Sequence, residues 1–175
     1  MEKKIKSNLI YDGKIIKLYN DDVICDEDKL ATREYIVHPG GACILPFLED
    51  KIIFIKQFRY AYHKDILELP AGKLEKGEEP IKAAIRELEE ETGYISDNLI
   101  SLGSVYPSVG YTDEVIHLFV AKDLKKGKQH LDYDEKVDVT LLSLDEALKM
   151  IENDDIKDAK TVIAILKYKE FISMK

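Results

Sequence analysis

Residues 72–94 read GKLEKGEEPIKAAIRELEEETGY, a glycine-containing loop followed by a segment rich in glutamate. Pro80 suits the first turn of a helix, because its missing N–H would be unpaired there, and Gly93 suits the left-handed residue just past a helix end. We therefore expect a helix from Pro80 to Thr92. At about 100° per residue, an apolar stripe forms from Ile81, Ala84, Ile85 and Leu88. A neighbouring stripe carries Glu87, Glu90 and Glu91. We expect the apolar face to pack against the rest of the protein and the acidic face to bind a ligand.

The acidic stripe needs a compensating charge. Like charges one helical turn apart repel by a few tenths of a kcal/mol per pair. Arg86 lies four residues before Glu90 and can orient it, but one guanidinium cannot neutralise all the glutamates between residues 87 and 91. Mg²⁺ prefers carboxylate oxygens, water and substrate phosphate as ligands. A solvated acidic helix face is the alternative, but the glycine loop before the helix favours a metal and phosphate site.

The segment resembles the Nudix box, written G-x5-E-x7-R-E-U-x-E-E-x-G-U, where U is a bulky apolar residue. The matching positions are Gly72, Glu78, Arg86, Glu87, Leu88, Glu90, Glu91 and Gly93. Tyr94 stands where an aliphatic residue is usual. The resemblance implies a hydrolase that cleaves a nucleoside diphosphate linked to another moiety. It also implies Mg²⁺, or Mn²⁺, bound by the glutamates of the box.

Further segments resemble one branch of this family, the ADP-ribose pyrophosphatases. They are residues 33–40, 57–60, 68–72, 106–114 and 158–161. One position departs from the branch, because Val109 stands where a proline is usual. The absence of that proline, which would fix φ, leaves the loop more adaptable. The resemblance therefore implies ADP-ribose as substrate and leaves another diphosphate open.

The resemblance also assigns roles in the reaction. It implies metal binding by the carboxylates of Glu87, Glu90 and Glu91 and the backbone carbonyl of Ala71, with Arg86 and Glu90 in the catalytic centre. Water that attacks phosphorus needs a base or an orienting carboxylate. The branch pattern points to Glu135 in a loop, and Glu114 is the second candidate. A solvated loop acid is the alternative for Glu135.

Two arginines resemble substrate-binding positions of the branch. Guanidinium groups suit bidentate phosphate contacts, which makes Arg59 and Arg33 candidates. Both lie near expected strands, so an exposed cross-strand ion pair is the alternative. Glu78 is expected either to cap the helix or to pair with Arg86, and Gly72 is expected to shape the loop.

Composition fits one small enzyme. The chain has 175 residues, 45% hydrophobic content, a net charge of -8 and a pI near 5.1. This charge disfavours a partner such as long nucleic acid. The N-terminus lacks the apolar core of a secretory signal, and no window approaches the roughly eighteen apolar residues of a membrane span. We expect a cytoplasmic protein without a membrane partner.

The remaining pattern predicts strands and helices around the box. Residues 8–11 and 14–19 read as strands, with a turn at 20–22. Further strands are expected at 42–48, 52–58, 99–106, 114–121 and 137–142, and helices from a capping box at Ser143 to about 151 and from 159 to about 172. The predicted fold class is α/β (α+β), a Nudix-type α/β/α sandwich with a mixed central sheet. An N-terminal antiparallel β meander is expected in addition.

Residues 1–38 are expected to form a β-strand arm and residues 39–175 the catalytic domain. The resemblance implies a homodimer in which this arm contributes to the partner's substrate pocket. The arm has too little continuous apolar sequence for a core of its own, so it packs either on a partner or on its own catalytic domain.

Three functions remain open from the sequence. The first is hydrolysis of ADP-ribose to AMP and ribose 5-phosphate. The second is the same reaction on another nucleoside diphosphate, such as a nucleotide sugar or a dinucleotide. The third is a nucleotide sensor without catalysis, which the complete set of box glutamates disfavours.

Overall fold

The computed structural model describes residues 1–131, 133 and 135–174, apart from the side chain of Glu27. The chain divides into two compact units. Unit 1 consists of Met1–Gly40 with Tyr106–Val115, and unit 2 consists of Gly41–Val105 with Ile116–Lys175. The expected assignment of residues 1–38 to a dimerisation arm stays a prediction.

Unit 1 contains an antiparallel sheet, as the sequence predicts. Its described strands are β1 (Lys3–Lys6), β2 (Leu9–Asp12), β3 (Lys17–Ile24) and β4 (Leu30–Val37). The short helix η1 (Asp26–Asp28) lies between β3 and β4. Strand β3 pairs with β1, β2 and β4. The turn expected at residues 20–22 is wrong, because β3 continues through it. Asp21 is buried there and accepts hydrogen bonds from Ser7 Oγ at 2.6 Å and Tyr35 Oη at 3.2 Å.

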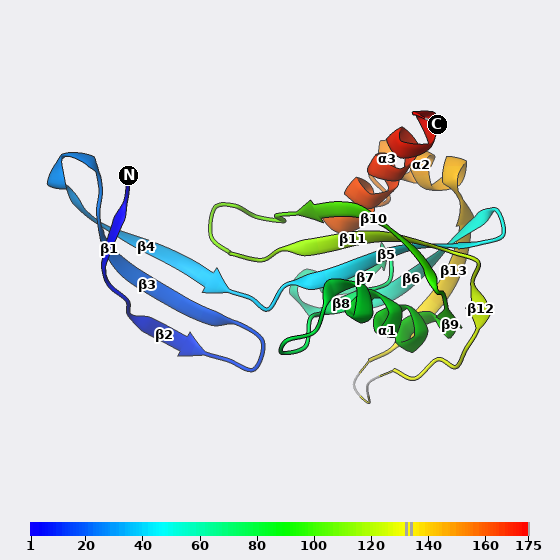
Figure 1. The fold of residues 1–175 in the computed structure, drawn as a ribbon, viewed down its shortest axis with the longest axis horizontal. Coiled ribbons are helices and arrows are strands. Elements are labelled where there is room, and N and C mark those ends of the chain that lie inside the picture. Colours follow the sequence, from blue (N-terminus) through cyan, green and yellow to red (C-terminus); the bar gives the residue numbers. More distant parts are fainter. Residues whose placement is uncertain (132, 134, 175) are drawn as a thin grey trace. The chain divides into compact units, whose positions relative to one another are not determined.

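Unit 2 is built on a mixed sheet with the strand order β10-β11-β5-β6-β13 (Figure 1). Strand β7 pairs with β6, and β8 pairs with β5. The bounds are β5 Gly41–Leu48, β6 Lys51–Arg59, β7 Lys64–Glu68, β8 Ala71–Lys73, β10 Asn98–Val105, β11 Ile116–Lys122 and β13 Val137–Ser143. A 3-10 helix, η2 (Tyr60–Tyr62), follows β6, and a separate small pair forms from β9 (Tyr94–Ile95) and β12 (Lys125–Lys126). Strands β11 and β5 are parallel, whereas the other pairs are antiparallel.

Helices cover both faces of this sheet, which confirms the α/β/α sandwich (Figure 1). They are α1 (Pro80–Thr92), α2 (Leu144–Glu152) and α3 (Ala159–Ser173). Because side chains alternate along a strand, β5 serves both cores: Ala42 and Ile44 pack with α1, whereas Cys43 and Leu45 pack with α3. Among the described residues, no helix combines the length and the apolar character needed to span a membrane.

Helix α1 has the predicted bounds, but its buried face differs from the expected stripe. Gly93 ends the helix with φ 72°, in the left-handed region that glycine favours. Ala84 and Leu88 are buried as expected, together with Ala83. Ile81 and Ile85 are exposed. The two alanines and Leu88 pack with Ala42 and Ile44 of β5, so the buried face of the helix is centred on the alanines and not on the isoleucines.

Candidate metal and phosphate site

Arg86 connects three glutamates at the centre of the site. Its Nε and Nη2 atoms donate to the two carboxylate oxygens of Glu78 at 3.0 and 2.9 Å. Its Nη1 atom donates to Glu87 Oε1 at 2.7 Å and to Glu90 Oε2 at 2.9 Å, which is the expected contact four residues along the helix. The hydrogen bond with Glu78 is the largest cause that raises the pKa of Arg86. Of the two roles expected for Glu78, the structure contains the pairing with Arg86.

Gly72 makes room for the carboxylate of Glu87. A Cβ atom at Gly72 would lie 1.9 Å from Oε1 and 2.3 Å from Oε2 of Glu87. Both distances are far shorter than van der Waals contact, so any larger residue would displace the carboxylate. Gly72 itself is held in the sheet, where it pairs with Ala42 of β5. The absence of a side chain at Gly72 therefore allows the Glu87 carboxylate to take the position that it has.

Glu91 is buried beneath the strand that begins at Ala71. Its Oε2 atom accepts a hydrogen bond from the Ala71 N–H at 2.8 Å, and 3% of the residue is exposed. Burial raises the pKa of Glu91 to about 8, against the opposing effect of the Ala71 N–H. The charges of Glu87 and Glu135 add to this rise. The structure thus brings together the two predicted ligands Ala71 and Glu91.

The glutamates of the site carry more negative charge than Arg86 alone can compensate. Burial also raises the pKa of Glu87, although the hydrogen bond from Arg86 opposes it, and the charges of Glu90 and Glu135 raise it further. Carboxylates with raised pKa values in a poorly solvated place are stabilised in their charged form by a cation. Carboxylate and carbonyl oxygens are the ligands that hard divalent ions prefer. The residues present therefore fit a divalent metal ion.

Binding of such an ion requires some side chains to turn. Among the described residues, no three His, Cys, Asp or Glu side chains already form a group that could hold a metal. Glu87 and Glu90 both point an oxygen at Arg86. Coordination would therefore exchange part of the Arg86 contacts for metal contacts, while the bidentate pair with Glu78 keeps the guanidinium in place.

Residues 127–130 run along the C-terminal end of α1 and lead toward Glu135. The Gly127 N–H donates to the Gly93 carbonyl at 2.8 Å, and the Gln129 side chain donates to the Glu91 carbonyl at 2.6 Å. A Cβ atom at Gly93 would lie 3.0 Å from the Gln129 nitrogen, so this close approach adds to the reason for a glycine there. The segment is therefore fixed to the helix that carries the box glutamates.

Glu135, the first candidate for the base, lies within electrostatic reach of the box. Its charge contributes to the raised pKa values of Glu87 and Glu91, although Glu135 itself is exposed. Two neighbours used in the sequence match, Asp132 and Asp134, lie outside the described residues. The role of Glu135 as the base stays a prediction.

Two other predicted residues belong to unit 1. The Glu114 carboxylate lies 3.5 Å from His38 Nδ1. Arg33 on β4 donates from Nε to Glu2 at 3.0 Å and is partly exposed, as in the ion pair that was the alternative to substrate binding. Their roles as second candidate base and as substrate ligand stay predictions.

Arg59 lies in unit 2 and is bound to a buried glutamate. Its Nε and Nη2 atoms donate to the two oxygens of Glu68 at 2.6 and 2.8 Å. The Lys160 ammonium group, from the start of α3, contacts the same carboxylate. Burial acts to raise the pKa of Glu68, but the hydrogen bond from Arg59 and the charge of Lys160 lower it below its ordinary value.

Sequence reasoning assigned no role to Glu68 or Lys160. Both lie in segments that carry the resemblance to the ADP-ribose pyrophosphatase branch, residues 68–72 and 158–161. Their separation of 92 residues leaves no local spacing signal for the pair. Only the fold, which places α3 beside the end of β7, brings them together.

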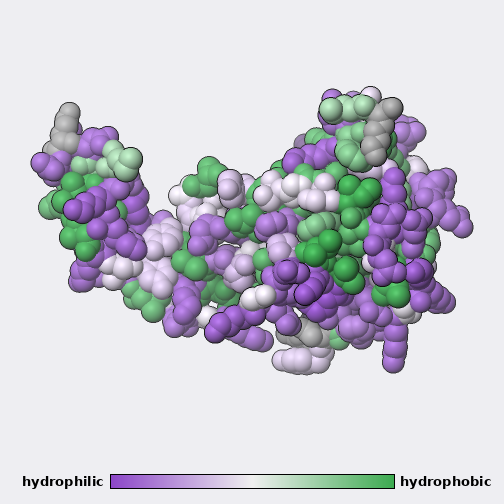
Figure 2. All heavy atoms as spheres, viewed as in Figure 1, coloured by the Kyte–Doolittle hydropathy of each residue, from purple (hydrophilic) through white to green (hydrophobic). Residues whose placement is uncertain are grey.

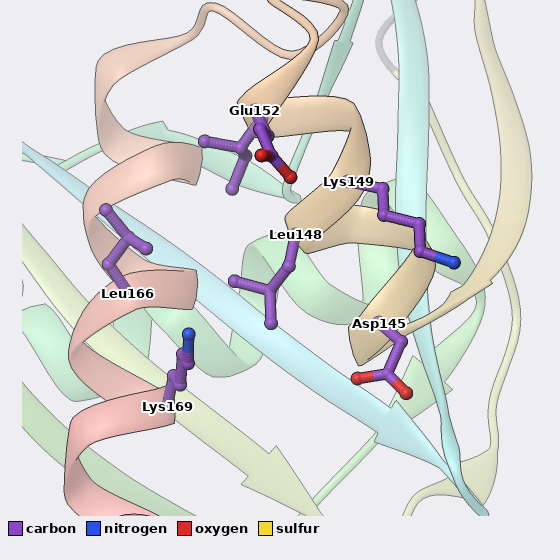
Figure 3. A pocket seen from close by; sticks show the side chains of 7 residues that line it. Asp145, Leu148, Lys149, Glu152, Leu166 and Lys169 are labelled. Carbon is purple, nitrogen blue, oxygen red and sulfur yellow. The ribbon is translucent and has the colours of Figure 1, made fainter.

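A hollow of about 430 Å³ lies elsewhere in unit 2, between α2 and α3 (Figure 3). It is lined by Asp145, Leu148, Lys149, Ile151, Glu152, Leu166 and Lys169. None of these residues belongs to the box. Since α1 and α3 pack with opposite faces of β5, this hollow is separate from the carboxylate site.

Comparison with known proteins agrees with the geometry of the site. The NUDIX domain model matches residues 37–164. The chain is 46% identical over 167 residues to the ADP-ribose pyrophosphatase of Bacillus subtilis, covering 94% of this chain and 90% of that protein. It is 47% identical, with the same coverage, to the methanol dehydrogenase activator of Bacillus methanolicus.

More distant proteins also match the chain, in sequence or in fold. The GDP-mannose pyrophosphatase of Citrobacter koseri is 32% identical over 172 residues, covering 92% of this chain and 85% of that protein. The crystal structure of an ADP compounds hydrolase superposes with a TM-score of 0.89 at 20% identity, covering 98% of this chain and 94% of that one. The last likeness shows the fold, and the matches together confirm the resemblance that the box predicted.

Proposed function

Because this chain belongs to the Nudix family, we propose that it hydrolyses the diphosphate bond of ADP-ribose, with water, to AMP and ribose 5-phosphate. The single observation that carries the proposal is the complete carboxylate set, in which Glu91 is buried against Ala71 with a pKa raised to about 8. A sensor without catalysis has no use for a set that is costly to bury. The Bacillus subtilis relative named for ADP-ribose supports the choice of substrate.

Nudix hydrolases generally use divalent metal ions, and Mg²⁺ or Mn²⁺ is the proposed choice here. The carboxylates of Glu87, Glu90 and Glu91 and the carbonyl of Ala71 would hold it. When bound, such an ion neutralises the diphosphate and the charge that develops during cleavage. Before the ion binds, Arg86 holds Glu87 and Glu90 through hydrogen bonds at 2.7 and 2.9 Å, part of which coordination would replace.

The proposed base is Glu135, with Glu114 as second candidate. Glu135 belongs to the same unit as the box, and its charge reaches Glu87 and Glu91. A base must come within hydrogen-bond reach of the attacking water. Glu135→Gln should therefore lower kcat far more than Glu114→Gln, and the reverse order would transfer the role to Glu114.

Arg59 and Arg33 are the proposed substrate ligands. Arg59 is held by the bidentate contact with Glu68, and 38% of its side chain is exposed. An anchored guanidinium with an exposed part loses little side-chain entropy when it contacts a phosphate. Arg33 is proposed for the same chemistry within unit 1, where it pairs with Glu2.

A second candidate function is the same cleavage on another nucleoside diphosphate. Relatives named for GDP-mannose support it. Val109, which stands where the ADP-ribose branch has a proline, is exposed in unit 1 and is the place where substrate preference is expected to differ. The relative named as a methanol dehydrogenase activator supports, as an alternative, a role in regulating another enzyme.

A homodimer is also proposed, with unit 1 in the interface. On the face seen in Figure 2, apolar atoms of unit 1 reach the surface between charged ones. Its exposed large apolar side chains include Ile5, Leu9, Ile10, Tyr11, Ile15 and Leu30. Large apolar side chains exposed in one small unit favour packing on another chain. The cytoplasmic location expected from the sequence stays a prediction.

The substrate is tested with a panel of ADP-ribose, nucleotide sugars, dinucleotides and nucleoside triphosphates, each with Mg²⁺ and with Mn²⁺. We expect release of AMP from ADP-ribose to be the fastest reaction and to depend on Glu91. Faster cleavage of another diphosphate would keep the chemistry and replace the substrate. Binding of nucleotide without turnover of any compound would contradict the proposal.

The dimer is tested by light scattering coupled to size-exclusion chromatography. Leu30→Glu places a charge in the apolar surface of unit 1 and should shift the mass from two chains to one. Leu166→Glu, on the exposed side of α3, is a control that should leave the mass unchanged. A wild-type protein that elutes as a single chain would contradict the proposed homodimer.

A further inference from the structure

The N-terminal end of α3 is connected by a series of hydrogen bonds to the residue that follows β7. Asp158, the N-cap of α3, accepts hydrogen bonds from the Thr161 N–H at 3.1 Å and from the Thr161 hydroxyl at 2.6 Å. The Thr161 hydroxyl in turn accepts a hydrogen bond from the Leu69 N–H at 2.8 Å. Thr161 and Leu69 are both fully buried. The cap of a helix is thus linked directly to the backbone of the segment that precedes the site.

Charged side chains hold the same segment from a second direction. Glu68 is bound by Arg59 from β6 and by Lys160 from α3, and Lys160 also pairs with Asp158 at 3.0 Å. The Glu68 and Lys160 side chains are largely buried, with 3% and 12% exposed. Buried charges require partners in good geometry, because an unpaired one costs several kcal/mol. The position of Glu68 relative to α3 is therefore strongly determined.

Successive peptide groups of residues 69–71 are each held by a different element. The Leu69 N–H donates to Thr161 of α3, and the Pro70 carbonyl accepts from the Ile44 N–H of β5 at 2.9 Å. The Ala71 N–H donates to Glu91 of α1 at 2.8 Å. The segment is thus anchored from both helix layers and from the sheet. Because Leu69 is only two residues before Ala71, a displacement of Thr161 is expected to move Ala71 as well.

We infer that Thr161 and Lys160 are positioning residues for the metal-binding segment, acting through Leu69 and Glu68 on Ala71 and Glu91. The inference rests on the proposed function, because it takes the Ala71 carbonyl and the Glu91 carboxylate as ligands of a divalent ion. Neither residue touches the ion or the substrate in this role. They determine how well the preformed part of the site matches the ion, which is the known effect of groups behind metal ligands.

The test measures Mn²⁺ affinity in the absence of substrate, by electron paramagnetic resonance of free Mn²⁺ or by calorimetry. Thr161→Val keeps the branched shape but removes the acceptor for the Leu69 N–H. We expect its dissociation constant for Mn²⁺ to rise about tenfold, the lower end of the effect of such outer partners. Thr161→Ser restores the hydroxyl and should bind Mn²⁺ like the wild type.

A matched control separates positioning from the loss of a side-chain hydrogen bond at the N-terminal end of a helix. Ser143→Ala removes the side-chain cap of α2, where Ser143 Oγ accepts from the Glu146 N–H, on an element that does not contact the box. It should lower stability without changing the Mn²⁺ dissociation constant. An equal loss of Mn²⁺ affinity in this control would overturn the inference, as would a Thr161→Val protein that binds Mn²⁺ like the wild type.

Lys160→Gln provides a second variant should Thr161→Val fail to fold. Glu68 keeps its bidentate partner Arg59, so the variant retains a counter-charge. It should also weaken Mn²⁺ binding about tenfold, and Lys160→Arg should recover most of it. Unchanged Mn²⁺ binding in Lys160→Gln would overturn the inference for Lys160. With ADP-ribose as substrate, Thr161→Val and Lys160→Gln should lower kcat at limiting Mn²⁺ and leave KM nearly unchanged.

The outcomes for the two proposals are distinguishable. If the wild type binds Mn²⁺ but cleaves no ADP-ribose, the proposed substrate is wrong, and the Mn²⁺ affinities still judge the positioning role. A wild type that binds neither Mn²⁺ nor Mg²⁺ would overturn the inference together with the proposed metal site.

Discussion

Glu68 and Glu91 are two buried glutamates at opposite ends of the segment 68–71, yet their surroundings differ. Glu68 begins the segment and is paired with Arg59 and Lys160, so its pKa lies below the ordinary value. Glu91 contacts the last residue of the segment, Ala71, and burial near Glu87 and Glu135 raises its pKa to about 8. Burial is nearly the same, with 2% and 3% of the residues exposed.

The difference shows how to separate a structural carboxylate from a functional one. A buried carboxylate with cations of the protein around it is complete and holds elements together. A buried carboxylate surrounded by further carboxylates is incomplete, and a bound cation would complete it. On this basis we propose that Glu68 supports the site, whereas Glu91 is part of it.

Removal of the charge at Glu91 should have the largest effect on activity. Glu91→Gln keeps the shape of the side chain and can still accept the Ala71 N–H, but it no longer binds a cation well. Metal ions contribute several kcal/mol to stabilisation of developing charge, so kcat/KM for ADP-ribose should fall about a thousandfold. The measurement is AMP release at saturating Mg²⁺.

The control for this variant is Glu170→Gln on the exposed part of α3, which should behave like the wild type. Metal-free Glu91→Gln should be at least as stable as the wild type at pH 8, because a costly buried charge is gone. If its activity stays within about tenfold of the wild type, Glu91 is not a ligand, and the comparison with Glu68 loses its basis.

The same change at Glu68 should act mainly on stability. Glu68→Gln leaves Arg59 without its counter-charge and the buried Lys160 with Asp158 as its remaining partner, and loss of one partner from a buried pair costs about 3 kcal/mol or more. The measurement is the free energy of unfolding in urea. Asp65→Asn removes an exposed pair with Lys56 at 3.5 Å and should cost less than about 1 kcal/mol. An equal loss in the free energy of unfolding for Glu68→Gln and Asp65→Asn would show that the buried pairs of Glu68 stabilise the protein no more than the exposed pair of Asp65.

Gly72→Ala should disturb the functional carboxylates without touching Glu68. The added Cβ would overlap the Glu87 carboxylate, which has to leave its position beside Arg86. A displaced ligand is expected to lower kcat/KM about 10- to 100-fold, with little change in the melting temperature. Gly110→Ala, where a Cβ meets no atom within 4 Å, is the matched control for the melting temperature. Unchanged activity in Gly72→Ala would mean that Glu87 does not need this position.

Much of this architecture follows from local signals. Pro80 and Gly93 are sufficient to predict the ends of α1, and the spacing between Gly72 and Gly93 is sufficient to identify the family. The mixed sandwich follows from alternating apolar strands and separate helices. These features are predictable because each depends on residues that are close in sequence.

The parts that could not be predicted depend on contacts between distant residues. The turn expected at residues 20–22 fails because Asp21 finds its partners Ser7 and Tyr35 on neighbouring segments of the sheet. The pairing of Glu68 with Lys160 spans 92 residues. The need for glycine at position 72 appears only when the Glu87 side chain is in place. In each case the reason for the residue lies in a partner that local spacing does not reveal.

The most direct test of the contrast is the pH dependence of the free energy of unfolding in metal-free protein. The pKa of Glu91 is raised from 4.5 to about 8, so the folded state binds a proton more tightly than the unfolded state. Its contribution is therefore fully present below about pH 4.5 and is lost as pH rises toward about 8. Glu68, with a lowered pKa, contributes stability above pH 4.5 that is lost as pH falls below this value.

The two glutamates should thus give opposite slopes in separate pH ranges. Urea unfolding in EDTA should show the wild type losing at most about 1.4 kcal/mol per pH unit between pH 5 and 8. Glu91→Gln should flatten this range and keep the loss of stability in acid, because Glu68 is intact. Mn²⁺ added to the wild type should also flatten it, since the cation stabilises the charged form. A slope that persists in Glu91→Gln would assign the raised pKa to another group, with Glu87 as the next to test by the same substitution.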